Sequence, residues 1–179
     1  MEIVIGSWGS YNACNERALG SQWLDLSDYD CWEEIEAELI DQGFELKGID
    51  EELFIQDIED NWGFSGDYMH PKRLFEIFKS AGLDTKHKEE TALAFIGTRC
   101  WDDFVGLVEQ YGDDWDRDIY YYPNRTPAEV AEEMVWSCYP ELDFEKLGWI
   151  GNFVTIDYES MADEMPYYEV SGGTIEIRE

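Results

Sequence analysis

Residues 30–41, DCWEEIEAELID, combine an apolar face with an uninterrupted acidic face. Trp32, Ile35 and Leu39 recur at positions i, i+3 and i+7, which places them on one side of a helix. The stretch also carries six acids and no cation, although Glu–Lys pairs stabilise a helix and like-charge pairs cost roughly 0.2–0.5 kcal/mol. Two of these acids lie toward the C-terminus, where the helix dipole disfavours them. The stretch therefore predicts a helix with one buried stripe and an outer face whose charge serves something outside the fold.

The same acidic bias extends over the whole chain. Its 179 residues include 42 Asp and Glu against 12 Lys and Arg, a formal net charge of −30 at pH 7. Duplex DNA carries about one negative charge per 1.7 Å of axis, so roughly 50 Å of duplex would carry thirty charges. Such a chain is unsuited to binding nucleic acid through its phosphates and suited to imitating them. The alternative is a general acidic surface for solubility or high salt, which favours small hydrophobic residues and diffuse charge, whereas this chain has eight Trp and clustered acids.

Composition predicts a folded, soluble, cytoplasmic protein. Hydrophobic residues make up 44% of the chain and aromatic residues 16%, whereas disordered acidic chains are poor in aromatics. We expect no signal peptide and no membrane partner, because the first residues are acidic and strand-like and no apolar run approaches the roughly 18 residues of a membrane span. The cysteines show no zinc-binding spacing and are expected to be reduced and buried: Cys14, Cys31, Cys100 and Cys138.

The distribution of charge predicts the domain organisation. Residues 1–71 carry a net charge of −16, residues 72–99 carry +2, and residues 100–179 carry −16. We therefore expect an α+β fold arranged as an elongated chain of three small lobes. These are an N-terminal acidic α+β lobe (1–66), a central helical lobe (67–111) and a C-terminal acidic α+β lobe (112–179).

Periodicity and turn residues predict the elements within each lobe. The first lobe should contain strands at 3–5, 22–26 and around 53–55, a loop over 11–20, and a helix that Ser27 or Asp28 caps and Gln42-Gly43 ends. The middle lobe should contain helices at 71–82, 89–96 and 102–111. The third should contain an aromatic segment at 120–122, a helix from Thr126 to about Tyr139, and a hairpin of 167–170 and 174–177 around a Ser-Gly-Gly turn.

Patterns typical of catalysis or metal binding are incomplete. Asp114, Asp116 and Asp118 resemble the start of an EF-hand loop, but Ile119 and Arg125 stand where that loop needs Gly and Glu. Neither histidine has an obvious nucleophile partner, and no glycine-rich phosphate loop is present. A glycoside hydrolase site built from two carboxylates stays an alternative, because 42 acids offer every spacing. No feature of the sequence favours one pair of acids over another. We therefore expect no catalytic residue, no metal and no cofactor.

Several short motifs occur together in a characteristic order. Tyr11-Asn12, Leu19-Gly20 and the W-L-D-L run at 23–26 follow the first strand, the segment 51–59 reads EELFIQDIE, and 156–159 reads IDYE before the C-terminal hairpin. Their order and spacing over most of the chain resemble the ArdA antirestriction family. Such proteins are elongated, three-lobed and non-enzymatic, and usually dimerise through the C-terminal lobe. They copy the shape and charge of bent B-form DNA. They occupy the DNA-binding groove of type I restriction-modification enzymes, which lies in the methyltransferase and specificity core of the enzyme.

The resemblance implies roles for particular residues. Acids of three regions would stand in for phosphates: Asp28, Asp30, Glu33, Glu34, Glu36, Glu38, Asp41, Asp57, Glu59, Asp60, Asp102, Asp103, Asp113, Asp114, Asp116, Asp118, Glu129, Glu132 and Glu133. The segment around Phe153, Ile156, Asp157 and Tyr158 would lie near a homodimer interface. One departure is a basic cluster that interrupts a continuous mimic: Lys72, Arg73, Lys79, Lys86, Lys88 and Arg99.

Two other functions stay open. An acidic binding module would sequester another basic DNA-binding protein, such as a nucleoid-associated protein. A carboxylate-based hydrolase would depend on one or two Asp or Glu residues and not on bulk charge.

Overall fold

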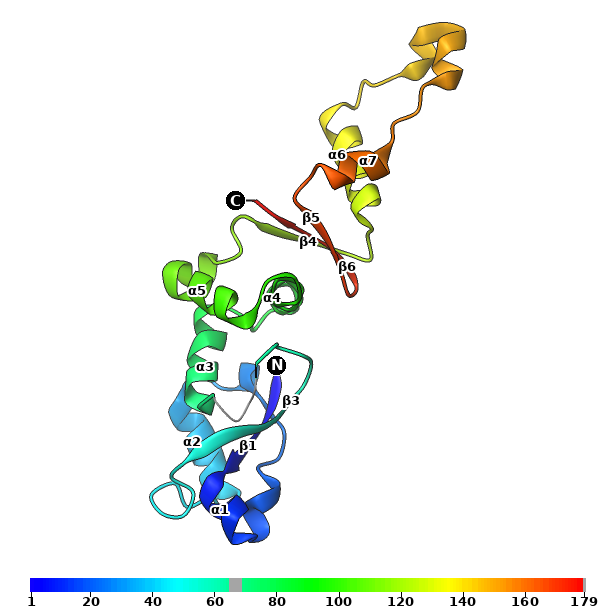
Figure 1. Cartoon of the computed structure of the whole chain (residues 1–179). Coiled ribbons are helices and arrows are strands. Elements are labelled where there is room, and N and C mark those ends of the chain that lie inside the picture. The colour runs from blue at the N-terminus through cyan, green and yellow to red at the C-terminus, as the bar shows by residue number, and fades with distance from the viewer. Residues whose placement is uncertain (65–68, 179) are drawn as a thin grey trace. The chain divides into compact units, whose positions relative to one another are not determined.

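The computed structural model describes residues 1–64 and 69–178, which form a mixed α+β protein (Figure 1). Contacts divide the chain into two compact units, Met1–Trp115 and Asp116–Glu179. Each unit contains one three-stranded antiparallel sheet and its own helices. The α+β class is confirmed, and the division into three lobes stays a prediction.

The sheet of the first unit has the order β2-β1-β3. β1 (Glu2–Ser7) lies between β2 (Leu24–Asp25) and β3 (Leu53–Ile58) and is antiparallel to both. Ile3 and Ile5 of β1 are fully buried. α2 (Trp32–Asp41) buries Trp32, Ile35 and Leu39, so the predicted apolar stripe is confirmed.

Three local expectations for this region are wrong. Residues 11–20 are not one loop, because α1 (Trp8–Ala13) and the 3-10 helix η1 (Glu16–Leu19) form there, with Ser7 and Asn15 as their caps. Ser27 and Asp28 do not cap α2, whose N-cap position is Cys31. They lie in the 3-10 turn η2 (Leu26–Asp28), and Asp25 is the cap of that turn. The strand expected at 22–26 shortens to the two residues of β2 for the same reason, since the chain turns into η2 at Leu26.

The helical part of the first unit follows β3. α3 (Pro71–Ser80), α4 (Lys86–Thr98) and α5 (Trp101–Tyr111) lead into the 3-10 turn η4 (Gly112–Asp114). The predicted helices are confirmed, with α4 beginning three residues earlier than expected. The indole N–H of Trp115 donates to the carbonyl of Ala81 (2.9 Å) and its ring meets Phe104 edge-on, so the end of η4 is anchored in the core.

The second unit has the sheet order β4-β6-β5. β4 (Ile119–Pro123) and β5 (Tyr167–Val170) are both antiparallel to β6 (Gly173–Ile177), and the predicted hairpin is confirmed with Gly172 at φ +87° in its turn. α6 (Pro127–Cys138) begins with a complete capping box of Thr126 and Glu129. The 3-10 segment η5 (Phe144–Phe153) and α7 (Tyr158–Asp163) stand between α6 and β5.

The expectation of buried cysteines is wrong, because all four thiols are free and exposed. Cys31 and Cys100 occupy the N-cap positions of α2 and α5, Cys14 is the C-cap of α1, and Cys138 ends α6. All four cysteines thus lie at helix ends that are open to solvent, whereas other helix ends, such as the C-cap Ala81 of α3, are buried.

Candidate functional site

Two acidic side chains are used inside the fold. The first, Asp50, is fully buried, and it accepts hydrogen bonds from the Ser10 hydroxyl and from the backbone N–H of Glu45 (2.8 Å). Arg17 Nε lies 2.9 Å from Asp50 Oδ2. Burial opposes ionisation of Asp50, but these hydrogen bonds and the Arg17 charge outweigh it and hold the pKa of Asp50 below its ordinary value. The network joins α1, η1 and the loop before β3.

The second buried acid is Glu176 of β6, which is 3% exposed. It accepts a hydrogen bond from the Tyr122 hydroxyl (2.9 Å) and forms an ion pair with Arg178, whose guanidinium lies over the Tyr120 ring. Burial and the neighbouring Glu176 carboxylate raise the pKa of Tyr122 to about 12. Both buried acids are therefore fully accounted for by stabilising partners inside the chain.

Replacing Tyr122 by Phe should loosen the sheet of the second unit. Leaving the buried Glu176 carboxylate one donor short costs about 1–3 kcal/mol, so amides of β4 and β6 should exchange roughly five- to a hundredfold faster at pH 7. Folding raises the pKa of Tyr122 from 10.0 to about 12, so its contribution is complete below pH 10 and is lost as the pH rises toward 12. The variant should therefore show a shallower alkaline loss of protection than the parent. Hydrogen exchange measures both, and equal acceleration in the exposed control Tyr139→Phe would contradict the assignment.

The acids of residues 28–41, which comprise α2 and the segment that leads into it, have no ion-pair partner in the described chain, unlike Asp50 and Glu176. Glu34, Glu38 and Asp41 recur at i, i+4 and i+7; Glu34 and Asp41 are exposed, and Glu38 is half-buried at the edge of the buried stripe. Glu34, Glu36 and Glu38 accept hydrogen bonds, but the donors are neutral: a backbone N–H, an indole and an amide. In the part of the chain that the structure describes, no acid between residues 28 and 41 has an ion-pair partner within 4.0 Å. This surface therefore carries negative charge that no ion pair neutralises, although a backbone hydrogen bond lowers the pKa of Glu33 and the nearby charge of Lys72 adds to this effect.

The other predicted acids also lie at the surface. Asp57 is on β3 with Glu59 and Asp60 after it, Asp102 and Asp103 are in the first turn of α5, Asp113 and Asp114 are in η4, Asp116 and Asp118 precede β4, and Glu129, Glu132 and Glu133 are on α6. Of the whole predicted set, all are exposed except Glu36, Glu38 and Asp116, which are half-buried.

Some of these surface acids are neutralised within the chain. Asp113 pairs with Lys88, and Arg117 Nε lies 3.2 Å from Asp118. Glu133 Oε1 lies 2.6 Å from Arg125. Sequence spacing gave no sign of the Asp113 and Glu133 pairs, because tertiary structure brings these partners together. The uncompensated surface is therefore smaller than the acid count suggests.

The basic cluster is largely occupied by the same kind of contact. Arg73 pairs with Glu76 and Glu109, and Lys86 with Glu90. Lys79 lies over the rings of two phenylalanines of its own helix. Together with the pair of Lys88 and Asp113, these contacts explain why cations concentrate on α3 and α4: they offset acids of the first unit.

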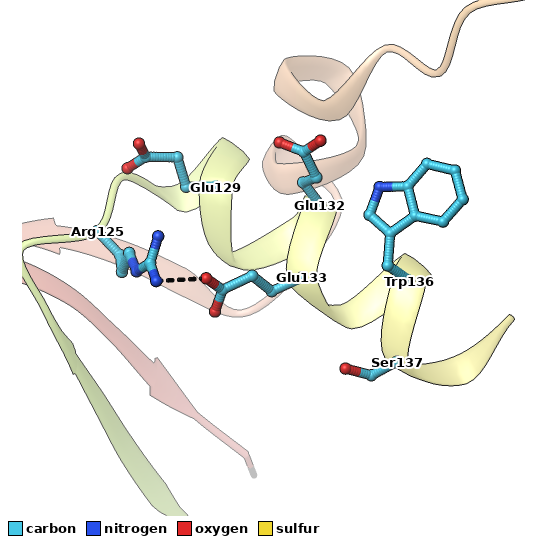
Figure 2. A pocket seen from close by; sticks show the side chains of 6 residues that line it. All are labelled: Arg125, Glu129, Glu132, Glu133, Trp136 and Ser137. Atoms are coloured by element: carbon cyan, nitrogen blue, oxygen red, sulfur yellow. Dashed lines mark ion pairs between the residues drawn. The ribbon is translucent and has the colours of Figure 1, made fainter. Parts of the chain in front are cut away.

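A hollow of about 560 Å³ lies along α6. Three acids, Glu129, Glu132 and Glu133, line it together with Arg125, Trp136 and Ser137 (Figure 2). Figure 2 shows the Arg125–Glu133 ion pair toward one end and the indole of Trp136 near Glu132 at the other. The hollow therefore combines carboxylates with an exposed aromatic ring, a combination suited to binding a cation.

A second hollow, of about 380 Å³, shares Glu129 and Glu132 with the first. Its other wall is formed by Ile156, Asp157, Tyr158 and Glu159. Residues predicted for a dimer interface and residues predicted for DNA mimicry therefore line the same surface of the second unit. Asp157 also caps α7 by accepting from the N–H of Ser160, which lowers the pKa of Asp157.

Large apolar side chains stand exposed in η5. Trp149 is 75% exposed and Phe153 77%, and they meet edge-on at 6.1 Å between ring centroids. Leu147 and Ile150 are also about half exposed. Residues 147–156, LGWIGNFVTI, contain no charged side chain in a chain that is 30% charged. The sequence analysis placed Phe153 near a dimer interface and did not include Trp149. The uncharged run contains both residues and could have indicated both.

No group of three or more His, Cys, Asp or Glu in residues 1–64 and 69–178 is arranged to hold a metal ion. Within the same residues, no helix is long and apolar enough to cross a bilayer. In comparisons with known proteins, no protein-family model matches the chain, and no curated protein matches it either. The fold and the surface define the chain as an acidic α+β protein whose exposed carboxylates are spread over both units.

Proposed function

We propose that this protein is an antirestriction protein that imitates B-form DNA and competitively occupies the DNA-binding groove of a type I restriction-modification enzyme. The observation that carries the proposal is the face of α2, whose acids lie exposed or half-buried and form no ion pair in the described chain. The motif order that resembles the ArdA family supports the same function. It would act in the cytoplasm as a non-enzymatic inhibitor without a cofactor.

The physical basis of the inhibition is the replacement of phosphates by carboxylates. Glu34 and Glu38 stand one helical turn apart, about 6 Å along the axis, which is comparable to two axial phosphate steps on one DNA strand. Cations that line the groove would contact these carboxylates in place of DNA. Since many weak contacts share the binding energy, no single acid should be indispensable.

A competition assay tests this function. A purified type I methyltransferase core bound to a labelled target duplex is titrated with the protein at two salt concentrations. We expect near-stoichiometric displacement of the duplex that weakens as salt rises, because contacts between exposed charges are screened. Failure to displace, with folded protein and active enzyme, would reject the proposal and favour sequestration of another basic DNA-binding protein.

We also propose that the protein forms a homodimer through the uncharged, exposed segment 147–156. Two chains that each carry −30 repel one another, and this repulsion is least where charge is absent. Trp149 and Phe153 would supply the apolar contact, with Ile156, Asp157 and Tyr158 beside it.

Replacing Trp149 and Phe153 by Ser should dissociate this dimer. Each aromatic ring buried at an interface contributes on the order of 2 kcal/mol or more, so the pair should weaken association at least a hundredfold. Light scattering coupled to size exclusion measures the mass against the 20.9 kDa of one chain. Leu19→Ser removes another exposed apolar side chain and should leave the mass unchanged. A parent protein that is monomeric at micromolar concentration would reject the dimer.

A further inference from the structure

Trp136 stands on the acidic side of α6 and outside its buried stripe. The buried residues of the helix are Val130, Ala131 and Val135, whereas Trp136 is 40% exposed. Its indole lies one turn after Glu132, and both side chains project from the same side of the helix (Figure 2). In the described part of the chain, no other ring packs against it. An exposed indole among carboxylates is more useful for binding a cation than for stabilising the fold.

The three carboxylates of this hollow are not equivalent. Glu129 is committed to the capping box, where it accepts from the N–H and hydroxyl of Thr126. Glu133 is committed to Arg125. Glu132 has no hydrogen bond or ion pair in the described chain. Of the three carboxylates, the one without any partner among the described residues is therefore the one that stands beside the indole.

We propose that Glu132 and Trp136 form a clamp for the guanidinium group of an arginine side chain from a protein partner. A guanidinium is planar, so it can stack on the indole face while donating two parallel hydrogen bonds to a carboxylate. The hollow of about 560 Å³ gives the arginine side chain of the partner room to enter. The Arg125–Glu133 ion pair lines the end of the hollow away from Trp136. The biological role of the clamp rests on the proposed function, since a DNA-binding groove supplies the arginines.

The clamp makes a prediction that bulk mimicry does not. Glu132→Gln and Glu133→Gln each remove one negative charge from the same turn of α6, so a purely electrostatic mimic would respond equally to both. With a clamp, Glu132→Gln weakens arginine binding at least threefold and Glu133→Gln less than twofold. Trp136→Leu, which changes no charge, should weaken binding by about three- to tenfold because the cation–π contact is lost.

The experiment uses N-acetyl-arginine amide as the probe and its neutral isostere, N-acetyl-citrulline amide, as the control. The indole N–H resonance of Trp136, identified by its loss in Trp136→Phe, is followed by NMR as each compound is added to the full chain. We expect a saturable shift with the arginine compound, at millimolar concentration, that the citrulline compound does not produce and that Glu132→Gln weakens. Equal shifts with both compounds, or equal weakening by Glu132→Gln and Glu133→Gln, would overturn the clamp.

This outcome is distinguishable from failure of the proposed function. If the arginine compound binds at Trp136 but the protein does not displace duplex from the methyltransferase, the clamp stands and the antirestriction role fails. If the duplex is displaced while the Trp136 resonance does not respond to the arginine compound, the clamp is overturned and the antirestriction role stands.

Discussion

Neutralising six acids of α2 and the segment that leads into it together should largely remove inhibition of a type I enzyme, while any one of them alone should lower it only slightly. The set is Asp30, Glu33, Glu34, Glu36, Glu38 and Asp41, each replaced by Asn or Gln. Exposed ion pairs contribute roughly 0.2–1 kcal/mol each, so six amount to about 1–6 kcal/mol and to a loss of affinity between about eightfold and ten-thousandfold. A single change such as Glu34→Gln should cost less than about fivefold. The duplex-displacement assay measures both.

The same six substitutions should not destabilise the fold. Glu33 and Glu34 in the first turn of α2 favour the helix dipole, whereas the acids near its C-terminus oppose the dipole and like charges at i, i+4 repel one another. These effects offset one another, so the urea midpoint should change little. Gln also keeps the side-chain oxygen that accepts from the indole of Trp32 at Glu36. Loss of inhibition with retained stability would locate the effect in binding.

A charge-matched control separates a shaped mimic from an acidic sequestrant. Six exposed acids outside the proposed surface are neutralised instead: Glu51, Glu52, Asp84, Glu141, Glu145 and Glu164. If the proposal is right, this variant keeps most of its inhibition although its net charge is the same as that of the α2 variant. Equal loss in both variants would favour bulk charge, and one acid whose replacement alone abolishes activity would favour a localised catalytic or binding site.

Replacing Asp50 by Ala should destabilise the first unit by about 3–5 kcal/mol. Removing one partner of a buried ion pair leaves the other uncompensated, and here Arg17 and the Ser10 hydroxyl both lose their acceptor. Urea unfolding followed by tryptophan fluorescence measures the change, since Trp8, Trp23, Trp32, Trp62, Trp101 and Trp115 all belong to this unit.

Lowering the pH should also destabilise the parent protein, because it protonates Asp50. The pKa of Asp50 is lowered on folding, so its contribution is complete above the ordinary value of 3.8 and is lost as the pH falls through the lower pKa of the folded state. The Asp50→Ala variant should lose less further stability over that acidic range than the parent. Glu51→Ala, an exposed neighbour, should change stability by no more than about 0.5 kcal/mol. An Asp50 variant as stable as this control would contradict the network.

Local patterns predicted the elements that local physics decides. The stripe of α2, the capping box of α6 and the hairpin around Gly172 were all readable, because helical period, N-capping and positive-φ glycine each depend on a few neighbouring residues. The helices α3, α4 and α5 were predicted on the same grounds. The turn into η2 was missed, because it depends on Asp25 accepting from Ser27, a choice among several nearby polar side chains.

The sequence by itself determined the amount of negative charge, the α+β class and the existence of an acidic helix with one buried face. Only the tertiary structure decided which acids stay uncompensated. It buries Asp50 and Glu176 in internal networks, pairs Asp113 with Lys88, and leaves Glu132 beside Trp136 without a cation. The physical reason is that charge is a property of composition, whereas its compensation depends on distances of a few Å between residues far apart in the chain.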